Sequence, residues 1–226
     1  MRPRNIARPA AAGALCLAFT CAQAASAQAP TTQPSDPSAT AAAKPRITVS
    51  RRKLDVPSGD RTAVKGTVQP GVSGVTVSLQ IRRGSHWKPL DRDTTDDEGR
   101  YKLRERLRRT GSAQARVRVA GGPDVAEGKR RIGRLNVYKR TYASMYGPGL
   151  YGNLLACGGR LSTGTLGVAH KTLPCGTKVT IKRGNRTVRV PVVDRGPFVG
   201  GREYDLTSAT AAKLGFPGLG TILTTR

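Results

Sequence analysis

The amino-acid sequence predicts a mainly β protein, in which an immunoglobulin-like β-sandwich precedes a small closed barrel with one or two short helices. Short runs that alternate apolar and polar residues recur along the chain from residue 46 onward. Turn-forming residues separate these runs, since the 226 residues include 27 glycines and 15 prolines. A single segment near the C-terminus has helical composition instead. The pattern of many short strands favours a sandwich followed by a barrel.

The first 27 residues have the pattern of a secretory signal peptide. Three arginines and no acidic residue precede the apolar stretch 10–22, and Ala25-Ser26-Ala27 fits a small-residue cleavage site. Bulky residues before Cys16 and Cys21 disfavour lipid attachment, although an anchor stays an alternative. No apolar run reaches the roughly 18 residues of a transmembrane helix. We therefore expect export to the cell envelope, either periplasmic or extracellular and associated with the wall.

Residues 28–45 consist mainly of Pro, Thr, Ser and Ala and contain no large apolar residue. Such a segment cannot bury enough apolar surface to fold, so we expect a disordered linker. The sandwich is expected over 46–138 and the barrel over 139–226. The alternating runs of the sandwich are 46–49, 63–68, 75–81, 101–107, 115–119 and 132–137.

Two features of the sandwich have competing interpretations. Trp87 follows a turn, and we expect a core residue there rather than a ligand platform. The basic run 100–109 is expected to be a strand with inward apolar residues and solvated charges. The alternative for this run is a stripe that binds a polyanion.

The charge of the chain is strongly positive, with 39 Lys and Arg against 14 Asp and Glu. Residues 46–138 hold 22 basic and 10 acidic side chains, and residues 139–226 hold 13 and 3. Coulomb attraction therefore favours an acidic partner, such as a wall polymer, an anionic membrane surface or extracellular nucleic acid. Because the chain has a secretion signal, we expect no specific nucleic-acid partner.

The C-terminal part combines short strands with one helix. The candidate strands are 167–169, 178–182, 187–193 and 221–224. The helix is expected to begin after an N-cap at Thr207 or Ser208, to run through 209–214 and to stop at Gly215. This composition favours a small closed barrel over a second sandwich.

Three carboxylates occur in this part, namely Asp194, Glu203 and Asp205. Asp194 ends a candidate strand and is either a titrating group at the barrel rim or a turn cap. Asp205 precedes the helix, and composition alone favours a helix-entry role. His170 is able to donate a hydrogen bond or exchange a proton near neutral pH, although a lone histidine is more often structural.

Four of the six tyrosines lie here, and their rings suit either sugar stacking or core packing. After removal of the leader, Cys157 and Cys175 are the remaining cysteines, and in an oxidising compartment they predict one disulfide. It would close a loop of about 18 residues and contribute about 3 kcal/mol. The two histidines, His86 and His170, do not complete a zinc site with these cysteines, so we expect no metal and no other cofactor.

Four motifs follow one another in this part of the chain. They are ASMYGPG at 143–149, AHKTLPCGT at 169–177, DRGPF at 194–198 and YDLT at 204–207. Together they resemble the rare lipoprotein A (RlpA-like) family over about residues 141–226. The resemblance implies a six-stranded double-psi β-barrel, which is also the fold of expansins, barwin-like proteins and the barrel of membrane-bound lytic transglycosylase A.

The resemblance also implies action on peptidoglycan glycan strands, in some members as an endolytic lytic transglycosylase, a lyase that forms 1,6-anhydromuramyl ends. By similarity Asp194 is the acid/base and His170 its polar partner, while Asp205 matches an aspartate critical in expansins and transglycosylase A. The choice between the two aspartates stays open. The candidate substrate-binding residues are Tyr146, Tyr151, Lys171, Arg195, Phe198 and Tyr204.

One position departs from the family pattern. Members with lytic character commonly carry a glutamate after a glycine, about eleven residues before the histidine, where this chain has Gly159. The pair Cys157 and Cys175 is similar to the disulfide-stabilised barrels of expansin-type relatives. The alternative function is therefore a non-catalytic, expansin-like module that binds or loosens wall polymers. We expect a monomer that contacts glycan strands or another anionic wall polymer.

Overall fold

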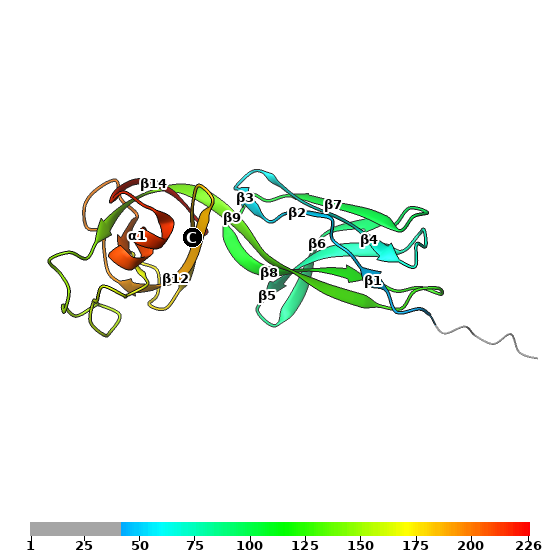
Figure 1. The fold of residues 1–226 in the computed structure, drawn as a ribbon, viewed down its shortest axis with the longest axis horizontal. Helices are drawn as coiled ribbons and strands as arrows, with labels where there is room; N and C mark the ends of the chain where they lie inside the picture. The colour runs from blue at the N-terminus through cyan, green and yellow to red at the C-terminus, as the bar shows by residue number, and fades with distance from the viewer. Residues whose placement is uncertain (1–41) are drawn as a thin grey trace, which may run out of the picture. The chain divides into compact units, whose positions relative to one another are not determined.

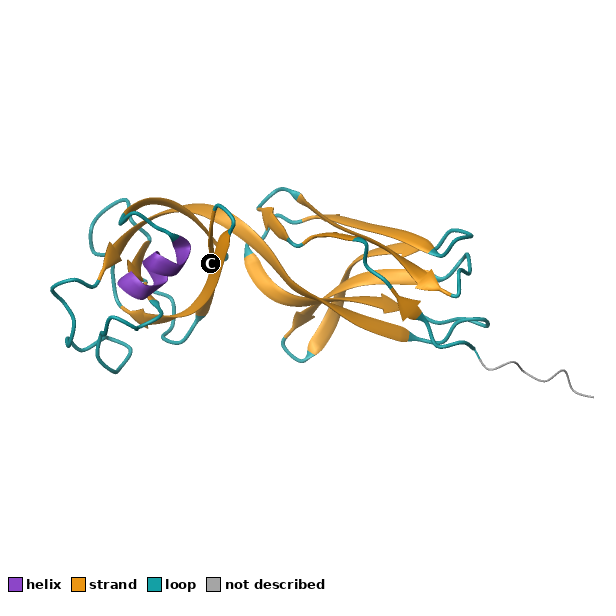
Figure 2. Cartoon of the chain, in the orientation of Figure 1, coloured by secondary structure: helices purple, strands orange, loops and turns teal. Residues whose placement is uncertain are grey.

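The computed structural model describes residues 42–226, which form β-strands, loops and one short helix (Figure 2). The predicted signal peptide and residues 28–41 of the predicted linker lie outside the described residues. Within residues 42–226, no helix is long and apolar enough to cross a membrane.

The N-terminal part of the described chain contains two packed β-sheets (Figure 1). In the first sheet β4 pairs with three strands; its members are β1 (Arg46–Ile47), β2 (Arg51–Lys53), β4 (Arg61–Gln69) and β7 (Arg100–Arg106). The second sheet has the order β6–β5–β8–β9, with β5 (Thr76–Arg83), β6 (His86–Thr94), β8 (Gly111–Val119) and β9 (Gly128–Tyr146). The short strand β3 (Asp55–Pro57) pairs with β9 in parallel.

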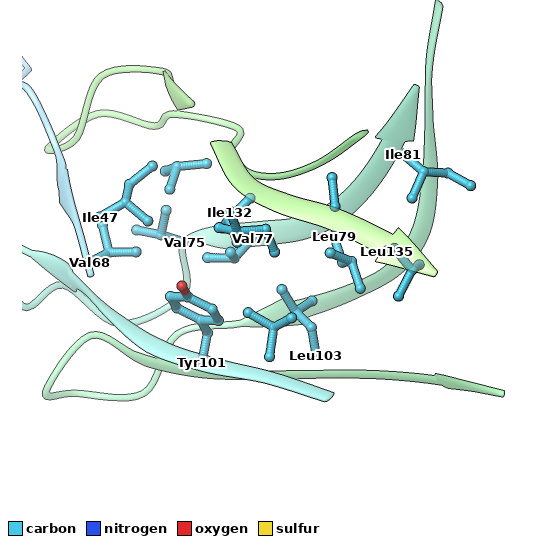
Figure 3. Close-up of a cluster of buried hydrophobic side chains, with 14 of the residues drawn as sticks. Ile47, Val68, Val75, Val77, Leu79, Ile81, Tyr101, Leu103, Ile132 and Leu135 are labelled. Carbon is cyan, nitrogen blue, oxygen red and sulfur yellow. The ribbon is translucent and has the colours of Figure 1, made fainter. Parts of the chain in front are cut away.

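A single apolar core joins the two sheets (Figure 3). Every second residue of β4, β7 and β8 is buried, as alternation predicts, and Val68, Leu79 and Leu103 meet between the sheets. The predicted sandwich is therefore present, while its immunoglobulin-like topology stays a prediction. Tyr101 in this core lies opposite Gly66, where a Cβ atom would come within 2.5 Å of the tyrosine oxygen. Gly66 thus makes room for Tyr101, whose hydroxyl donates to the Thr48 carbonyl at 2.7 Å.

The prediction that Trp87 lies in the core is wrong. Trp87 pairs with Arg82, which is exposed, and side chains of paired residues point to the same face of a sheet. The indole is half-buried on the outer face, with the Arg116 guanidinium carbon 4.2 Å from the ring centroid. Strand β6 lies at the sheet edge and has no clean alternation of burial, which is why the sequence pattern does not reveal it.

Strand β9 belongs to both parts of the molecule (Figure 1). Its residues 128–137 pair with β8, and residues 139–144 pair with β14 (Leu219–Thr224). The predicted boundary at 138/139 therefore falls inside a continuous strand. Asp55 of β3 accepts hydrogen bonds from Asn136 and Tyr138 at 2.8 and 3.0 Å, and it lies 3.5 Å from Lys182 of the barrel.

The C-terminal part is a closed six-stranded barrel, which confirms the predicted fold class. The strands follow the order β9–β13–β10–β12–β11–β14, and β14 returns to β9 to close the ring. The further members are β10 (Val168–Ala169), β11 (Lys178–Arg183), β12 (Arg186–Asp194) and β13 (Tyr204–Thr207). The pairs β9–β13 and β10–β12 are parallel, and the others are antiparallel.

The predicted helix is confirmed as α1 (Ser208–Leu214). Of the two candidate caps, Thr207 is the N-cap, because its side chain accepts a hydrogen bond from the Thr210 amide. Gly215 ends the helix with a left-handed φ of 59°, which glycine adopts without strain. Ala211 and Leu214 face the barrel core, so the helix closes one side of it.

Candidate functional site

The barrel brings Asp194 and Asp205 to one face of three adjacent strands. Asp194 ends β12, Asp205 lies in β13, and both are register partners of Ala169 in the intervening strand β10. The register of β10 with β12 shifts between Val168 and Ala169, and Ala169 lies between the two aspartates in a row across the three strands. Their Cα atoms are thus about 10 Å apart, twice the spacing between strands. Asp205 is therefore part of this row, and the helix-entry role belongs to Thr207.

Asp194 is held by main-chain donors. Its Oδ1 accepts hydrogen bonds from the amides of Ala156 and Arg195, both at 2.9 Å. Main-chain N–H groups only donate, so Oδ1 stays an acceptor and any proton on this carboxyl has to sit on Oδ2. Asp194 thus makes the predicted turn-capping contact through Oδ1, and neither amide bonds to its Oδ2.

Asp205 has a different kind of partner. Its Oδ1 accepts a hydrogen bond from the hydroxyl of Ser144, the buried residue that pairs with Asp205 from strand β9. A serine hydroxyl either donates or accepts. The contact between Ser144 and Asp205 is therefore compatible with both protonation states of the carboxyl.

Tyr146 supplies a donor near both aspartates. Its hydroxyl is buried and makes no hydrogen bond of normal geometry within residues 42–226. Burial raises the pKa of the phenol first, and the carboxylates of Asp194 and Asp205 raise it further. The hydroxyl therefore keeps its proton at neutral pH and lies buried beside the two carboxylates.

His170 is a neutral donor in this structure. Its Nδ1 accepts hydrogen bonds from the amides of Thr172 and Leu173, at 3.1 and 3.0 Å. The proton of the neutral ring is thus on Nε2. Burial against Tyr204, whose ring centroid is 4.8 Å away, lowers the pKa of His170 below its usual 6.5. Proton exchange at Nδ1 would break both amide contacts, so His170 suits a role as a donor.

The lowered pKa of His170 predicts a pH-dependent stability. As pH falls below 6.5, the unfolded chain takes up a proton on this residue before the folded chain does. The stability that neutral His170 contributes is therefore complete above pH 6.5 and is lost as the pH falls through the lower folded-state value. We expect the difference in melting temperature between the wild type and His170→Gln to shrink from pH 7.5 to pH 5. A constant difference across this range would contradict the assignment.

Arg195 and the disulfide hold the loops around Asp194. Cys157 and Cys175 form the predicted disulfide, with Cα atoms 5.5 Å apart. The guanidinium of Arg195 donates to the Leu173 carbonyl at 3.1 Å and lies 3.2 Å from the Cys175 sulfur. The Cys157 amide donates to the Val193 carbonyl at 3.2 Å, which seats the 154–160 loop beside β12. Arg195 was predicted to bind substrate, but its guanidinium contacts the loops around Asp194 instead.

Of the aromatic residues predicted to bind substrate, Tyr204 does not reach the surface. It is fully buried, and its hydroxyl donates to the Arg226 carbonyl at 3.1 Å. The reason is strand alternation, because Tyr204 precedes Asp205 and points to the opposite face. Phe198 is 83% exposed, and Tyr151 is 40% exposed with its hydroxyl 2.8 Å from the Ser208 oxygen. Lys171 is exposed and is available to a ligand.

Three contributors to the row were not expected from the sequence. Ser144 binds Asp205, Ala169 separates the two aspartates, and Ala156 donates its amide to Asp194. Ser144 lies within the motif at 143–149, so its position beside Tyr146 was a usable signal. Ala156 contributes through its backbone, for which a sequence carries no signal.

Gly159 occupies a tight turn that suits only glycine. Its φ is 79°, that of Gly158 is 93°, and its carbonyl accepts the Leu155 amide at 2.9 Å. A side chain in this backbone region costs about 1–2 kcal/mol. We therefore expect Gly159→Glu to destabilise the protein by about that amount without increasing glycan cleavage. Denaturant unfolding and product release measure the two effects, and a gain in activity would contradict this prediction.

Comparison with known proteins places residues 139–225 in the family described as lytic transglycolase. A Synechocystis protein named "Probable endolytic peptidoglycan transglycosylase RlpA" is 33% identical over 181 residues, covering 74% of this chain and 56% of the relative. The similarity thus extends beyond the barrel. An Aquifex aeolicus protein of the same name is 42% identical over 39% of this chain and 40% of its own length.

A Campylobacter jejuni protein named "Endolytic peptidoglycan transglycosylase RlpA" is 44% identical over 81 residues, 35% of this chain and 30% of the relative. The chain spans between 30% and 56% of the length of these three relatives. The family match covers the residues of the closed barrel, and Asp194 and Asp205 lie within the matched range. Residues 139–225 are therefore similar to the lytic transglycolase family, and their strands form a closed six-stranded barrel.

Proposed function

We propose that the barrel cleaves peptidoglycan glycan strands as an endolytic lytic transglycosylase. The observation that carries the proposal is the pair Asp194 and Asp205 on one face, with the Tyr146 hydroxyl near both. The names of the relatives support this substrate class. We further propose that the chain is exported and acts in the cell envelope, as its leader sequence suggests.

The reaction needs one carboxyl that gives and then recovers a proton. The acid protonates the glycosidic oxygen, the bond from C1 of the muramic acid to this oxygen breaks, and the leaving sugar keeps the electron pair. The resulting carboxylate then takes the proton of the C6 hydroxyl, whose oxygen bonds to C1. A 1,6-anhydro ring forms, the carboxyl is restored, and no water is consumed.

We assign the proton-transferring role to Asp205 and the role of a fixed anion to Asp194. The Ser144 hydroxyl accommodates a change of protonation at Asp205, because it either donates or accepts. Asp194 instead faces two amides that only donate, and its negative charge would stabilise the positive charge that develops at C1. The assignment chooses between two residues that sequence similarity left open.

Tyr146 is proposed to donate its buried hydroxyl to an aspartate carboxylate during the reaction, because it lies beside both aspartates. A hydrogen bond to a charged or polarised group is worth about 1.5–3 kcal/mol, so Tyr146→Phe should lower the cleavage rate about 10- to 100-fold. Because this hydroxyl makes no hydrogen bond of normal geometry within residues 42–226, stability should change by less than about 1 kcal/mol. Rate assays and denaturant unfolding test both parts. A variant that loses stability as well as activity would point to a packing role.

The direct test uses purified protein and glycan strands freed of stem peptides by an amidase, incubated in water enriched in ¹⁸O. A lytic transglycosylase yields 1,6-anhydromuramyl ends without ¹⁸O, whereas a hydrolase yields reducing ends that carry the label. Mass spectrometry separates the two products by the mass of one water. Absence of both products, with the protein recovered on insoluble sacculi, would reject the enzyme and favour the second candidate.

The second candidate is a non-catalytic module that binds or loosens wall polymers. The observation that favours it is Gly159, which leaves the 154–160 loop without the family glutamate. This candidate predicts that the wild type and Asp205→Asn bind sacculi equally and that neither releases 1,6-anhydro products. Parallel sedimentation of the wild type and this variant with sacculi gives the comparison.

A further inference from the structure

The outer face of the β6–β5–β8–β9 sheet collects basic side chains from every one of its strands. Alternation on β8 turns Arg116 and Arg118 outward, away from the buried valines. Their register partners on β9 are Arg131 and Lys129, so four cations form two adjacent rows. We call the set the cationic face; its further members are Arg82, Arg92 and Arg134.

One acidic side chain compensates this face among residues 42–226. Glu127 lies 2.8 Å from Arg118 and 2.9 Å from Lys129. These two cations lower the pKa of Glu127 to about 2. Burial lowers the pKa of Arg116, the charges of Arg118 and Arg131 lower it further, and the charge of Glu127 raises it. Like charges are therefore crowded here, and a bound anion would relieve the repulsion.

Arg116 and Trp87 are held in place before any ligand arrives. The Arg116 Nε donates to the Gln80 oxygen at 2.8 Å, and the guanidinium lies over the Trp87 ring. Gln80 and Ser78 are buried beneath this layer and hydrogen-bonded to each other at 3.2 Å. On the same face the Gln114 oxygen is buried without a hydrogen-bond partner in the described part of the chain. The cationic face thus combines fixed charge, an aromatic ring and polar groups.

The opposite sheet is basic too, but acidic groups border it. Lys53 and Arg100 pair with Asp60 and Asp96, at 3.6 and 2.8 Å. Asp91 and Asp93 accept main-chain amides along the edge of β7, both at 2.6 Å. Most of the basic run 100–109 is therefore strand β7 (Arg100–Arg106), with solvated and partly compensated charges, and we place the polyanion site on the other sheet.

We propose that the cationic face binds a phosphate-bearing saccharide or polyol polymer of the cell wall. Residues two apart on β8 are separated by about 7 Å and rows on β8 and β9 by about 5 Å, so the cations are closely spaced. Phosphodiesters with short repeat units present charges at similar density, whereas a disaccharide repeat spreads its carboxylates further apart. Arginine pairs phosphate oxygens in a bidentate manner, and Trp87 offers a ring for the organic part of the repeat. This site is independent of cleavage by the barrel.

The test measures binding of the full-length mature chain to a poly(glycerol phosphate) polymer. Trp87 is the single tryptophan of the chain, so its fluorescence reports directly on this face. We expect saturable binding with a change of Trp87 emission. Replacing Arg116, Arg118 and Arg131 by Gln should weaken binding by at least about tenfold, since each removes a charge-assisted hydrogen bond.

The matched control replaces Arg51, Lys102 and Arg104 on the opposite sheet by Gln, which removes the same charge. Its affinity should stay within about twofold of the wild type, because general attraction is screened over a Debye length. Arg131→Glu serves as a second variant if the triple variant unfolds. The side chain of Arg131 makes no hydrogen bond or ion pair within residues 42–226, so its loss should not destabilise the fold. Equal losses in both triple variants, or binding without a change in Trp87 emission, would overturn the site.

Two further polymers test the chemistry of the partner. We expect weaker binding of hyaluronate, a carboxylate polymer with a disaccharide repeat, and of single-stranded DNA at the same charge concentration. Equal affinity for all three polymers would reduce the face to a general polyanion surface and overturn the proposal.

Discussion

Asp205→Asn is expected to lower the rate of glycan cleavage by about 10²–10⁴-fold, the range for loss of a general acid and base. An amide at this position keeps a hydrogen bond with Ser144 but has no proton to give at the working pH. The release of 1,6-anhydro products from amidase-treated glycan, followed over time, measures the effect. Binding to the glycan should be retained, so the loss should appear in kcat.

Asp194→Asn is expected to cause a smaller loss with a different signature. Its side-chain oxygen would still accept the amides of Ala156 and Arg195, so the loop geometry should persist. The variant lacks only the fixed negative charge, so cleavage should be slowed but still detectable. Complete inactivity of Asp194→Asn beside an active Asp205→Asn would exchange the two roles.

Glu203→Gln provides the control, because it is the third carboxylate of the barrel and pairs with Lys139. Neutralising it removes the same charge from the same domain without touching the aspartate row. Its activity should remain within about twofold of the wild type, as expected for an exposed ion pair. Full activity in both aspartate variants would reject the site as a whole.

Removal of the disulfide by Cys157→Ser and Cys175→Ser is the second large effect. Opening a loop of 18 residues should cost about 3 kcal/mol, equivalent to about 6–12 °C in melting temperature for a chain of this size. Activity should fall as well, because the adjacent Ala156 amide is one of two donors that fix Asp194. Thermal unfolding and product release are measured on the same preparations.

Treatment of the wild type with a reductant is the matched control for this variant. It should reproduce the lower melting temperature, and the double serine variant should not respond further. An unchanged melting temperature in the double variant would show that contacts such as the Cys157 amide to the Val193 carbonyl hold the loop by themselves. The activity loss would then need another cause.

Local and covalent features of this protein could be predicted from the sequence. The helix between Thr207 and Gly215 depends on hydrogen bonds within a few residues, so its caps are readable from residue types. The pairing of Cys157 with Cys175 follows from their being the two cysteines after the predicted signal peptide. The four motifs also identified the barrel; three lie at the ends of strands β9, β10 and β12, and the fourth is strand β13.

Side-chain direction was predicted less well. Trp87 and Tyr204 were placed on the wrong side of their strands, one as a core residue and one as a ligand contact. A strand shows its residues to alternate faces, and a change of one position in register reverses every side chain. Strand β6 is an edge strand and β13 has four residues, so neither has enough alternation to set its register from the sequence.

By itself, the sequence determined that the chain has a β fold, a helix that ends at Gly215, one disulfide and similarity to a family of barrel enzymes. These features depend on residue type and short-range order. Only the tertiary structure decided that Asp194 and Asp205 flank Ala169, that Ser144 and Ala156 hold them, and that Arg116 covers Trp87. Each of these contacts joins residues from different strands or loops, so it exists only once strand pairing has fixed the register.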